Sequence, residues 1–309
     1  MARRLQRNSR RSNGSTNVSV LSLQSHVVYG HVGNSVAAFV LQYLGFEVWA
    51  VPTVVFSNHP AHGSHRGAIT PAANIIELLA GLDEGGWLGE CEGILSGYLG
   101  SAENGRAVLE TVKRVRTVDA RIPYICDPVM AHEDGFFVDS DVQDMMRELV
   151  RSADVVLPNA TELAFLAGQP VDSLECAHAA AEIVRQTGPG LVICTSLPLP
   201  DGKIGTLLVE DETWLVATPK LEGDFHGAGD LFSALFAAYH LADLYPGGRL
   251  GLAVSATYAV LKATAEMGGG ELALIQAQEE LEEPFESYVA DLLTGPPAAP
   301  VDPKPPFPR

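Results

Sequence analysis

Short β-branched runs alternate with helical patterns along most of the chain, and this alternation constrains the fold more than any other feature. Because strand, helix and next strand in series form right-handed crossovers, the repeat predicts a mostly parallel sheet covered by helices on both faces. The expected strands are residues 18–23, 46–56, 93–96, 123–127, 154–158 and 191–195. The expected helices lie near residues 34–44, 71–82, 101–119, 140–152, 161–168 and 173–187.

The pattern changes after about residue 200. Residues 203–210 and 213–219 flank Asp211-Glu212 and predict an antiparallel hairpin at one edge of the sheet. Long helices are expected from about residue 229 to 266. A chain of 309 residues can bury one large core or at most two smaller ones, and we expect one α/β domain over residues 18–295.

The two ends differ in composition from this domain. Residues 1–17 are rich in arginine, contain no acidic residue and lack an apolar face, which predicts a disordered basic arm. A mitochondrial targeting role for this arm is the less favoured alternative. Residues 296–309 are rich in proline and predict a disordered tail.

Charge and cysteine content exclude several classes of function. The formal net charge of −18 argues against a nucleic acid or an anionic membrane as partner. The four cysteines are widely spaced and form no CxxC pair, so neither a disulfide framework nor a zinc site is expected. No apolar run reaches the roughly 18 residues of a membrane span, and no secretory leader is recognisable. We therefore expect a soluble cytoplasmic protein.

The sharpest local motif is DFHGAGDLFSALF, residues 224–236. Gly227 and Gly229 allow close approach of the backbone to a ligand, and the apolar periodicity that follows predicts the start of a buried helix. Asp230 then lies beside an anion-binding site, where a carboxylate can accept the proton of a substrate hydroxyl during phosphoryl transfer. The alternative is a glycine-rich turn with an acidic helix N-terminus.

Several further motifs follow predicted strands in order: QSHVVYGHVGNS, FSNHPAHGSHRG, SGYLGS, CDPVM and LPNATEL. Together with GAGD, they resemble the pyridoxal kinases, the vitamin B6 branch of the ribokinase-like superfamily. The resemblance extends from about residue 18 to 295 and implies a ribokinase-like fold. It also implies a homodimer that binds small-molecule substrates.

The resemblance implies particular roles on the acceptor side. Asp230 matches the catalytic base, and Gly227, Ala228 and Gly229 match the anion hole. Ser25 matches a serine that bonds the pyridine ring. The other substrate-binding positions implied are Val32, Phe56, His59, Tyr98 and Asp230.

On the nucleotide side, the resemblance implies ATP with Mg²⁺, and a monovalent cation such as K⁺ is left open. Asp127 and Glu162 match the residues that organise the metal. The ATP-binding positions implied are Asp127, Asn159, Glu162, Thr195, Ser196, Gly227 and Ala228.

Taken singly, these residues have structural explanations as well. Ser25 could end a strand by bonding backbone, and His26, His31 and His59 could be loop or core histidines. The Asp127-Pro128 pair could open a turn. Asn159 and Glu162 could cap a helix, and Phe56 and Tyr98 could be core aromatics. Their joint placement at strand ends favours the functional interpretation.

Four positions depart from the family pattern. Pro60 stands where the family usually has a threonine that meets the substrate, and Ala228 stands where a threonine is frequent. Ala131-His132 occupies a position that is often acidic in animal-type enzymes, and the Thr195 region replaces a bacterial-type lysine.

The expected activity is ATP-dependent phosphorylation of the 5′-hydroxymethyl group of pyridoxal, which gives pyridoxal 5′-phosphate. Pyridoxine and pyridoxamine are further candidate acceptors. The alternatives are a hydroxymethylpyrimidine or related kinase of the same fold, and a weakly active carrier of pyridoxal phosphate.

Overall fold

A computed structural model describes residues 18–294 of the chain. The predicted arm, residues 1–17, and the predicted tail, residues 296–309, lie outside the described residues, so both stay predictions. Within residues 18–294, no helix is long and apolar enough to cross a membrane.

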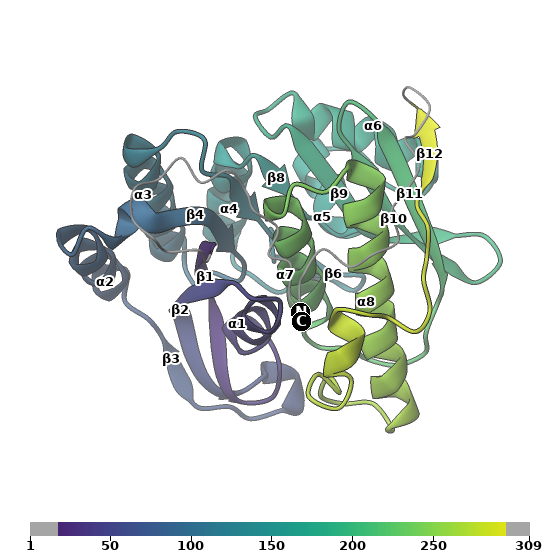
Figure 1. The fold of residues 1–309 in the computed structure, drawn as a ribbon, viewed down its shortest axis with the longest axis horizontal. Helices are drawn as coiled ribbons and strands as arrows, with labels where there is room; N and C mark the ends of the chain where they lie inside the picture. The colour runs from purple at the N-terminus through teal and green to yellow at the C-terminus, as the bar shows by residue number, and fades with distance from the viewer. Residues whose placement is uncertain (1–17, 295–309) are drawn as a thin grey trace, which may run out of the picture.

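A ten-stranded sheet forms the centre of the fold (Figure 1). Its parallel part confirms the predicted crossovers and contains β1 (Ser19–Tyr29), β2 (Glu47–Asn58), β4 (Cys91–Ser96), β5 (Tyr124–Cys126), β8 (Val155–Val156) and β9 (Leu191–Leu199). The strand order across the whole sheet is β12-β11-β10-β9-β8-β5-β4-β1-β2-β3.

Antiparallel strands lie at both edges of the sheet. The predicted hairpin is confirmed as β10 (Lys203–Val209) and β11 (Thr213–Pro219), but β12 (Asp291–Thr294) pairs outside it. At the other edge, β3 (Gly67–Ile69) pairs with β2. A separate two-stranded sheet joins β6 (Ala131–His132) to β7 (Gly135–Phe136). The sequence analysis did not predict β3, β6, β7 or β12, which are two to four residues long and too short to show a periodicity.

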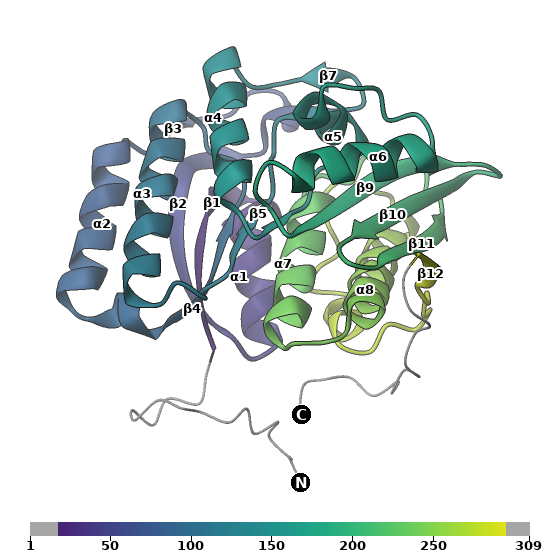
Figure 2. The same cartoon turned by 90° about the horizontal axis from the view of Figure 1, so that it is seen from above.

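Helices cover both faces of the sheet (Figure 2). One layer contains α1 (Asn34–Tyr43), α7 (Ala228–Leu241) and α8 (Pro246–Glu266). The other contains α2 (Ala72–Glu84), α3 (Ala102–Val118), α4 (Ser140–Ser152), α5 (Ala160–Ala167) and α6 (Leu174–Arg185). Successive strand residues point to opposite faces, so Val20 packs in the first core and Leu21 in the second. The apolar residues of one strand therefore supply both cores.

The predicted helical region 229–266 is divided into α7 and α8. Asp243 has a positive φ of 62°, which ends α7, and Pro246 occupies the first turn of α8. Proline is well suited to that position because its missing N–H would have no partner there.

Candidate active site

The parallel strands all end on the same side of the sheet, at their carboxyl ends, and α7 begins on that side. Gly227 is the N-cap of α7, with φ 87° and ψ 0°. A β-carbon at Gly227 would overlap the backbone oxygen of His31, so only glycine fits. The predicted glycine-lined start of a buried helix is confirmed. The positive dipole end of α7 can receive an anion there, while the N–H of Ala228 donates to the Phe225 oxygen at 3.2 Å.

Asp230 lies in the first turn of α7 and is partly buried. Burial raises its pKa from 3.8 to about 6, and the nearby backbone N–H of Gly33 opposes this shift because it favours the ionised carboxylate. A carboxylate with a pKa near 6 is ionised at neutral pH and is more basic than an exposed aspartate.

Gly33 also lies against Ser25. Gly33 is the N-cap of α1, with φ 55° and ψ −131°, and a β-carbon there would overlap both the backbone oxygen and Oγ of Ser25. Gly33 thus lies near both Ser25 of β1 and the carboxylate of Asp230. The structure therefore brings together two of the predicted site residues that are 205 positions apart in the chain.

Asp127 follows β5 and is 5% exposed. Ser233 donates a hydrogen bond of 2.5 Å to its Oδ2. The pKa of Asp127 is raised well above its usual value by burial first, and then by the charges of Glu162 and Asp230. The carboxylates of Glu162 and Asp230 are therefore both close enough to that of Asp127 to repel it.

Glu162 connects the segments that follow β5 and β8 by accepting hydrogen bonds from both. Its Oε1 accepts hydrogen bonds from the backbone N–H groups of Met130 (2.8 Å) and Ala131 (3.1 Å). With Asn159 it forms a capping box at the start of α5, so the cap expected from the sequence is confirmed. Burial raises the pKa of Glu162 to about 7, against the hydrogen bonds that its carboxylate accepts from the N–H groups of Met130, Ala131 and Asn159. At this position the helix-cap explanation and a role at the phosphates are compatible.

These carboxylates suit a hard divalent cation. Within residues 18–294, no three His, Cys, Asp or Glu side chains are arranged to hold a metal ion by themselves. Mg²⁺ is commonly held by one or two carboxylates together with substrate phosphates and water. Asp127 fits that requirement, because a nearby cation would relieve the repulsion that raises its pKa. Glu162 fits it less directly, since both of its oxygens already accept backbone N–H groups.

The predicted nucleotide-side residues lie beside α5. Thr195 forms a parallel bridge with Asn159, and its N–H donates to the Pro158 oxygen at 2.9 Å. Ser196 is exposed and has a positive φ of 55°, which is uncommon for a residue other than glycine. Thr195 and Asn159 are therefore close in space, as their assignment to one nucleotide region requires.

The predicted acceptor residues form a looser group. Val32 is buried in the loop before α1. Phe56 packs against His65 with ring centroids 4.8 Å apart, and Tyr98 packs against Phe137 at 6.3 Å. These partners agree with a packing role as well as with a ring-binding one.

His59 stacks on His226, with centroids 4.5 Å apart and planes 26° apart. Burial, followed by the charges of His226 and His62, lowers the pKa of His59 to about 4. The imidazole of His59 is therefore neutral at physiological pH, able to offer one donor and one acceptor. The stacking places a predicted substrate residue directly beside the residue that precedes Gly227.

Comparison with known proteins identifies the family. The model of the phosphomethylpyrimidine kinase family matches residues 90–272. The pyridoxal kinase PdxY of Rubrobacter xylanophilus is 46% identical over 274 residues, which cover 86% of this chain and 94% of that protein. The chain belongs to the pyridoxal kinase family. The PdxY protein of Deinococcus radiodurans is 42% identical over 285 residues, 88% of this chain and 96% of that protein.

Solved pyridoxal kinases have the same fold. Pyridoxal kinase from Leishmania donovani, in complex with ADP and pyridoxamine, gives a TM-score of 0.85 at 29% identity, over 90% of this chain and all of that one. A putative phosphomethylpyrimidine kinase from Bacteroides thetaiotaomicron has the same TM-score at 23% identity, which shows the fold alone. The predicted ribokinase-like architecture and the resemblance to pyridoxal kinases are confirmed.

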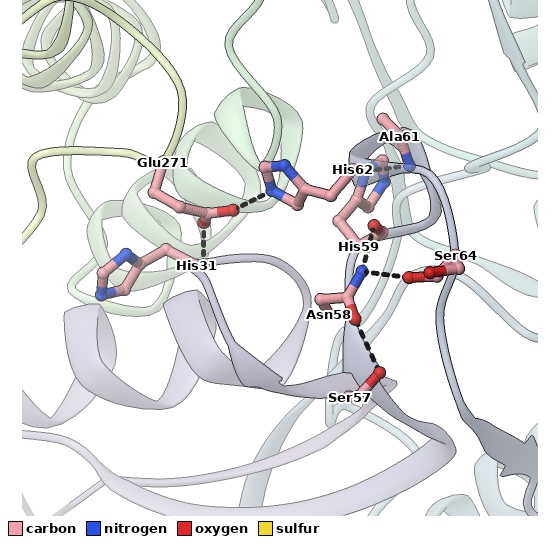
Figure 3. A network of polar contacts seen from close by, with 8 residues as sticks. All are labelled: His31, Ser57, Asn58, His59, Ala61, His62, Ser64 and Glu271. Atoms are coloured by element: carbon pink, nitrogen blue, oxygen red, sulfur yellow. Dashed lines mark hydrogen bonds and ion pairs between the residues drawn. The ribbon is translucent and has the colours of Figure 1, made fainter.

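In this pyridoxal kinase family member, the structure also assembles residues that the sequence analysis did not single out (Figure 3). Glu271 lies beside His31 and His62, and His226 lies between His59 and His62. Glu271 follows His62 by 209 residues, and no spacing rule connects them. The only local signal was the abundance of histidine after the second strand.

Proposed function

We propose that the protein transfers the γ-phosphoryl group of ATP to the 5′-hydroxymethyl group of pyridoxal. The observation that carries the proposal is the position of Gly33, which packs against Ser25 and whose backbone N–H lies close enough to the Asp230 carboxylate to lower its pKa. A ring held at Ser25 would present its alcohol to that carboxylate. Support comes from relatives named pyridoxal kinase and from related structures that hold ADP with pyridoxamine or pyridoxine.

In this proposal, Asp230 accepts the proton of the acceptor hydroxyl as its oxygen attacks the γ-phosphorus and the bond to ADP breaks. The N–H groups at Gly227, Ala228 and Gly229 stabilise the negative charge of the transferring group. Ala228 offers no side-chain hydroxyl to the phosphates, and its N–H already donates to the Phe225 oxygen at 3.2 Å.

Mg²⁺ is the proposed metal, and Asp127 is the residue best placed to hold it, with Glu162 acting on it through ordered water or by direct contact. When bound, the cation supplies neutralisation of the phosphate charge. A monovalent cation such as K⁺ is a further proposed component, which the same carboxylate-rich region supports by its charge.

Assembly as a homodimer and a cytoplasmic location complete the proposal. Large apolar side chains are exposed on neighbouring elements, at Val28 and Tyr29 of β1, Ile69 of β3 and Leu78 of α2. A second copy covering them would remove apolar surface from water. All four cysteines are unpaired and lie in the described residues, in keeping with a reducing compartment.

The deciding experiment is an assay of acceptor-dependent ADP release with pyridoxal, pyridoxine, pyridoxamine and hydroxymethylpyrimidine. We expect the highest kcat/KM with pyridoxal. Preference for hydroxymethylpyrimidine would support the second candidate, which the phosphomethylpyrimidine kinase description of the family model and Pro60 in the acceptor loop both keep open. Binding of pyridoxal phosphate with no turnover of any acceptor would identify a carrier instead.

A further inference from the structure

Glu271 connects two loops that come from distant parts of the chain (Figure 3). It lies five residues after the end of α8. Its Oε2 accepts a hydrogen bond of 2.6 Å from the backbone N–H of His31, in the loop that follows β1. Its Oε1 pairs with Nε2 of His62, in the loop that follows β2. The Glu271 side chain is only 16% exposed and that of His62 is 31% exposed, so water screens the pair less than a surface ion pair.

The backbone next to Glu271 is also attached to the start of α7. Gly270 forms a parallel bridge with Phe225, two residues before Gly227. On the other side, Leu272 packs beside Gly227, at 3.2 Å from where a β-carbon would be. The carboxylate of Glu271 therefore has a fixed position relative to the anion-binding turn.

Its bond to His31 strengthens this attachment. The backbone oxygen of His31 lies close to Gly227, and the backbone N–H of His31 donates to Glu271. Gly30, with φ 102°, is required here because a β-carbon would overlap the Glu271 carboxylate. The loop after β1 thus contacts both the Glu271 carboxylate and the glycine turn at the start of α7.

His62 belongs to the loop that carries the acceptor residues. It ends the 3₁₀ turn Pro60–His62, whose N-cap is His59, and the His59 ring accepts from the Ala61 N–H at 3.3 Å. The rings of His59 and His62 both face His226, at 4.5 and 6.0 Å between centroids. A displacement of His62 would therefore move His59 away from the start of α7.

We propose that Glu271 is a positioning residue, which holds the loop after β2 closed over the start of α7 by binding His62. The inference rests on the proposed function and deepens it. A closed loop would fix the acceptor alcohol near Asp230 and keep water from taking its place as phosphoryl acceptor. The proposal assigns specificity for the acceptor to a residue far in sequence from the acceptor-binding loops.

The test uses the full-length protein with the substitutions Glu271→Gln, Glu271→Ala and His62→Ala. Glu280→Ala is the matched control, because Glu280 also accepts a backbone N–H, from Phe285 at 2.6 Å, but lies on the 3₁₀ turn Gln278–Leu281 away from the loops. The measurements are KM for pyridoxal and for ATP, and the ratio of ADP released to phosphorylated acceptor formed.

We expect His62→Ala and Glu271→Ala each to raise KM for pyridoxal at least about tenfold and to raise the ADP-to-product ratio above one. KM for ATP should change less than about threefold. Glu271→Gln should lie between wild type and Glu271→Ala, because its amide oxygen still accepts from His31. Loss of kcat alone, with unchanged KM and a ratio of one, would overturn the proposal.

Hydrogen–deuterium exchange of residues 57–66 provides a readout that needs no turnover. In wild type, this loop is closed by the Ser57 N–H, which bonds the Arg66 oxygen at 2.7 Å. We expect faster exchange there in His62→Ala and Glu271→Ala, with little change in Glu280→Ala. Unchanged exchange in both variants would contradict the closure even if the wild type proves to act on another acceptor. If the wild type turns over no acceptor, the proposed function fails independently of this result.

Discussion

Ser233 donates a 2.5 Å hydrogen bond to Asp127, and this bond joins α7 to the end of β5. Ser233 lies three residues after Asp230, on the same side of the helix. The bond favours the ionised form of Asp127, in opposition to burial and to the charges of Glu162 and Asp230. One helix therefore carries both the proposed base and the group that prepares the proposed metal ligand.

Replacement of Ser233 by alanine should weaken the binding of Mg²⁺ at Asp127. Without the hydroxyl, the pKa of Asp127 rises further and its affinity for a cation falls. A lost charge-assisted hydrogen bond corresponds to about 1.5–3 kcal/mol, or roughly a 10- to 150-fold increase in the Mg²⁺ concentration for half-maximal rate. The measurement is a Mg²⁺ titration at saturating pyridoxal. Ser255→Ala, a buried serine on α8, is the control for stability, and equal Mg²⁺ dependence in both variants would contradict the prediction.

Replacement of Gly33 by alanine should disturb both sides of the site together. The new β-carbon would overlap Ser25 and force a backbone shift, because φ is 55° and no rotamer can relieve the overlap. We expect a higher KM for pyridoxal and at least about a 10²-fold fall in kcat/KM.

Gly202→Ala is the matched control for that change. Gly202 has φ 66°, yet its missing β-carbon faces open space. It should lose about 1 kcal/mol of stability and keep its kinetics. Kinetics of Gly33→Ala that resemble those of Gly202→Ala would show that the contact with Ser25 is unimportant.

Asp230→Asn tests the proposed base directly. The amide keeps the shape but cannot accept the proton, so kcat should fall by about 10²- to 10⁴-fold. Pyridoxal binding, measured by calorimetry, should change little. Asp243→Asn at the other end of α7 is the control, since asparagine tolerates its positive φ. A fall in binding with unchanged kcat would assign Asp230 to substrate affinity instead.

The pH dependence should report the raised pKa of Asp230. Burial disfavours the ionised form, so the group stays protonated up to about pH 6 instead of about pH 4. Only the ionised form can act as base, and kcat/KM should therefore be level above about pH 7 and fall about tenfold per pH unit below about pH 6. Glu162, with a pKa of about 7, titrates nearby, so the profile of Asp230→Asn is needed for assignment. Persistence of the acid limb in that variant would assign it to another group.

Much of the parallel sheet followed from the sequence, because strands buried on both faces are apolar throughout. Leu191, Val192 and Ile193 form such a run, and the structure divides them between the two cores. More than one helix was expected between residues 229 and 266, but the position of the break between α7 and α8 was not predicted. In the structure, the positive φ of Asp243 follows the end of α7, and Pro246 lies in the first turn of α8.

The candidate site was predictable where one short segment contained the whole signal. GAGD required a glycine at the start of a helix, and Gly227 has that conformation. The Glu271–His62 pair was beyond sequence reasoning, since it depends on a packing between two loops that no local pattern specifies. The roles of the predicted site residues stay predictions until the variants above are assayed.

The burial of α7 decides which of the reacting groups can move. From Leu231 to Tyr239 every side chain of this helix is buried, so its first turn is anchored to the hydrophobic core. Asp230 cannot travel toward an alcohol without repacking that interior. The alcohol must be delivered to a stationary base, and evolution of new acceptor preferences should therefore alter the surrounding loops while the helix stays the same.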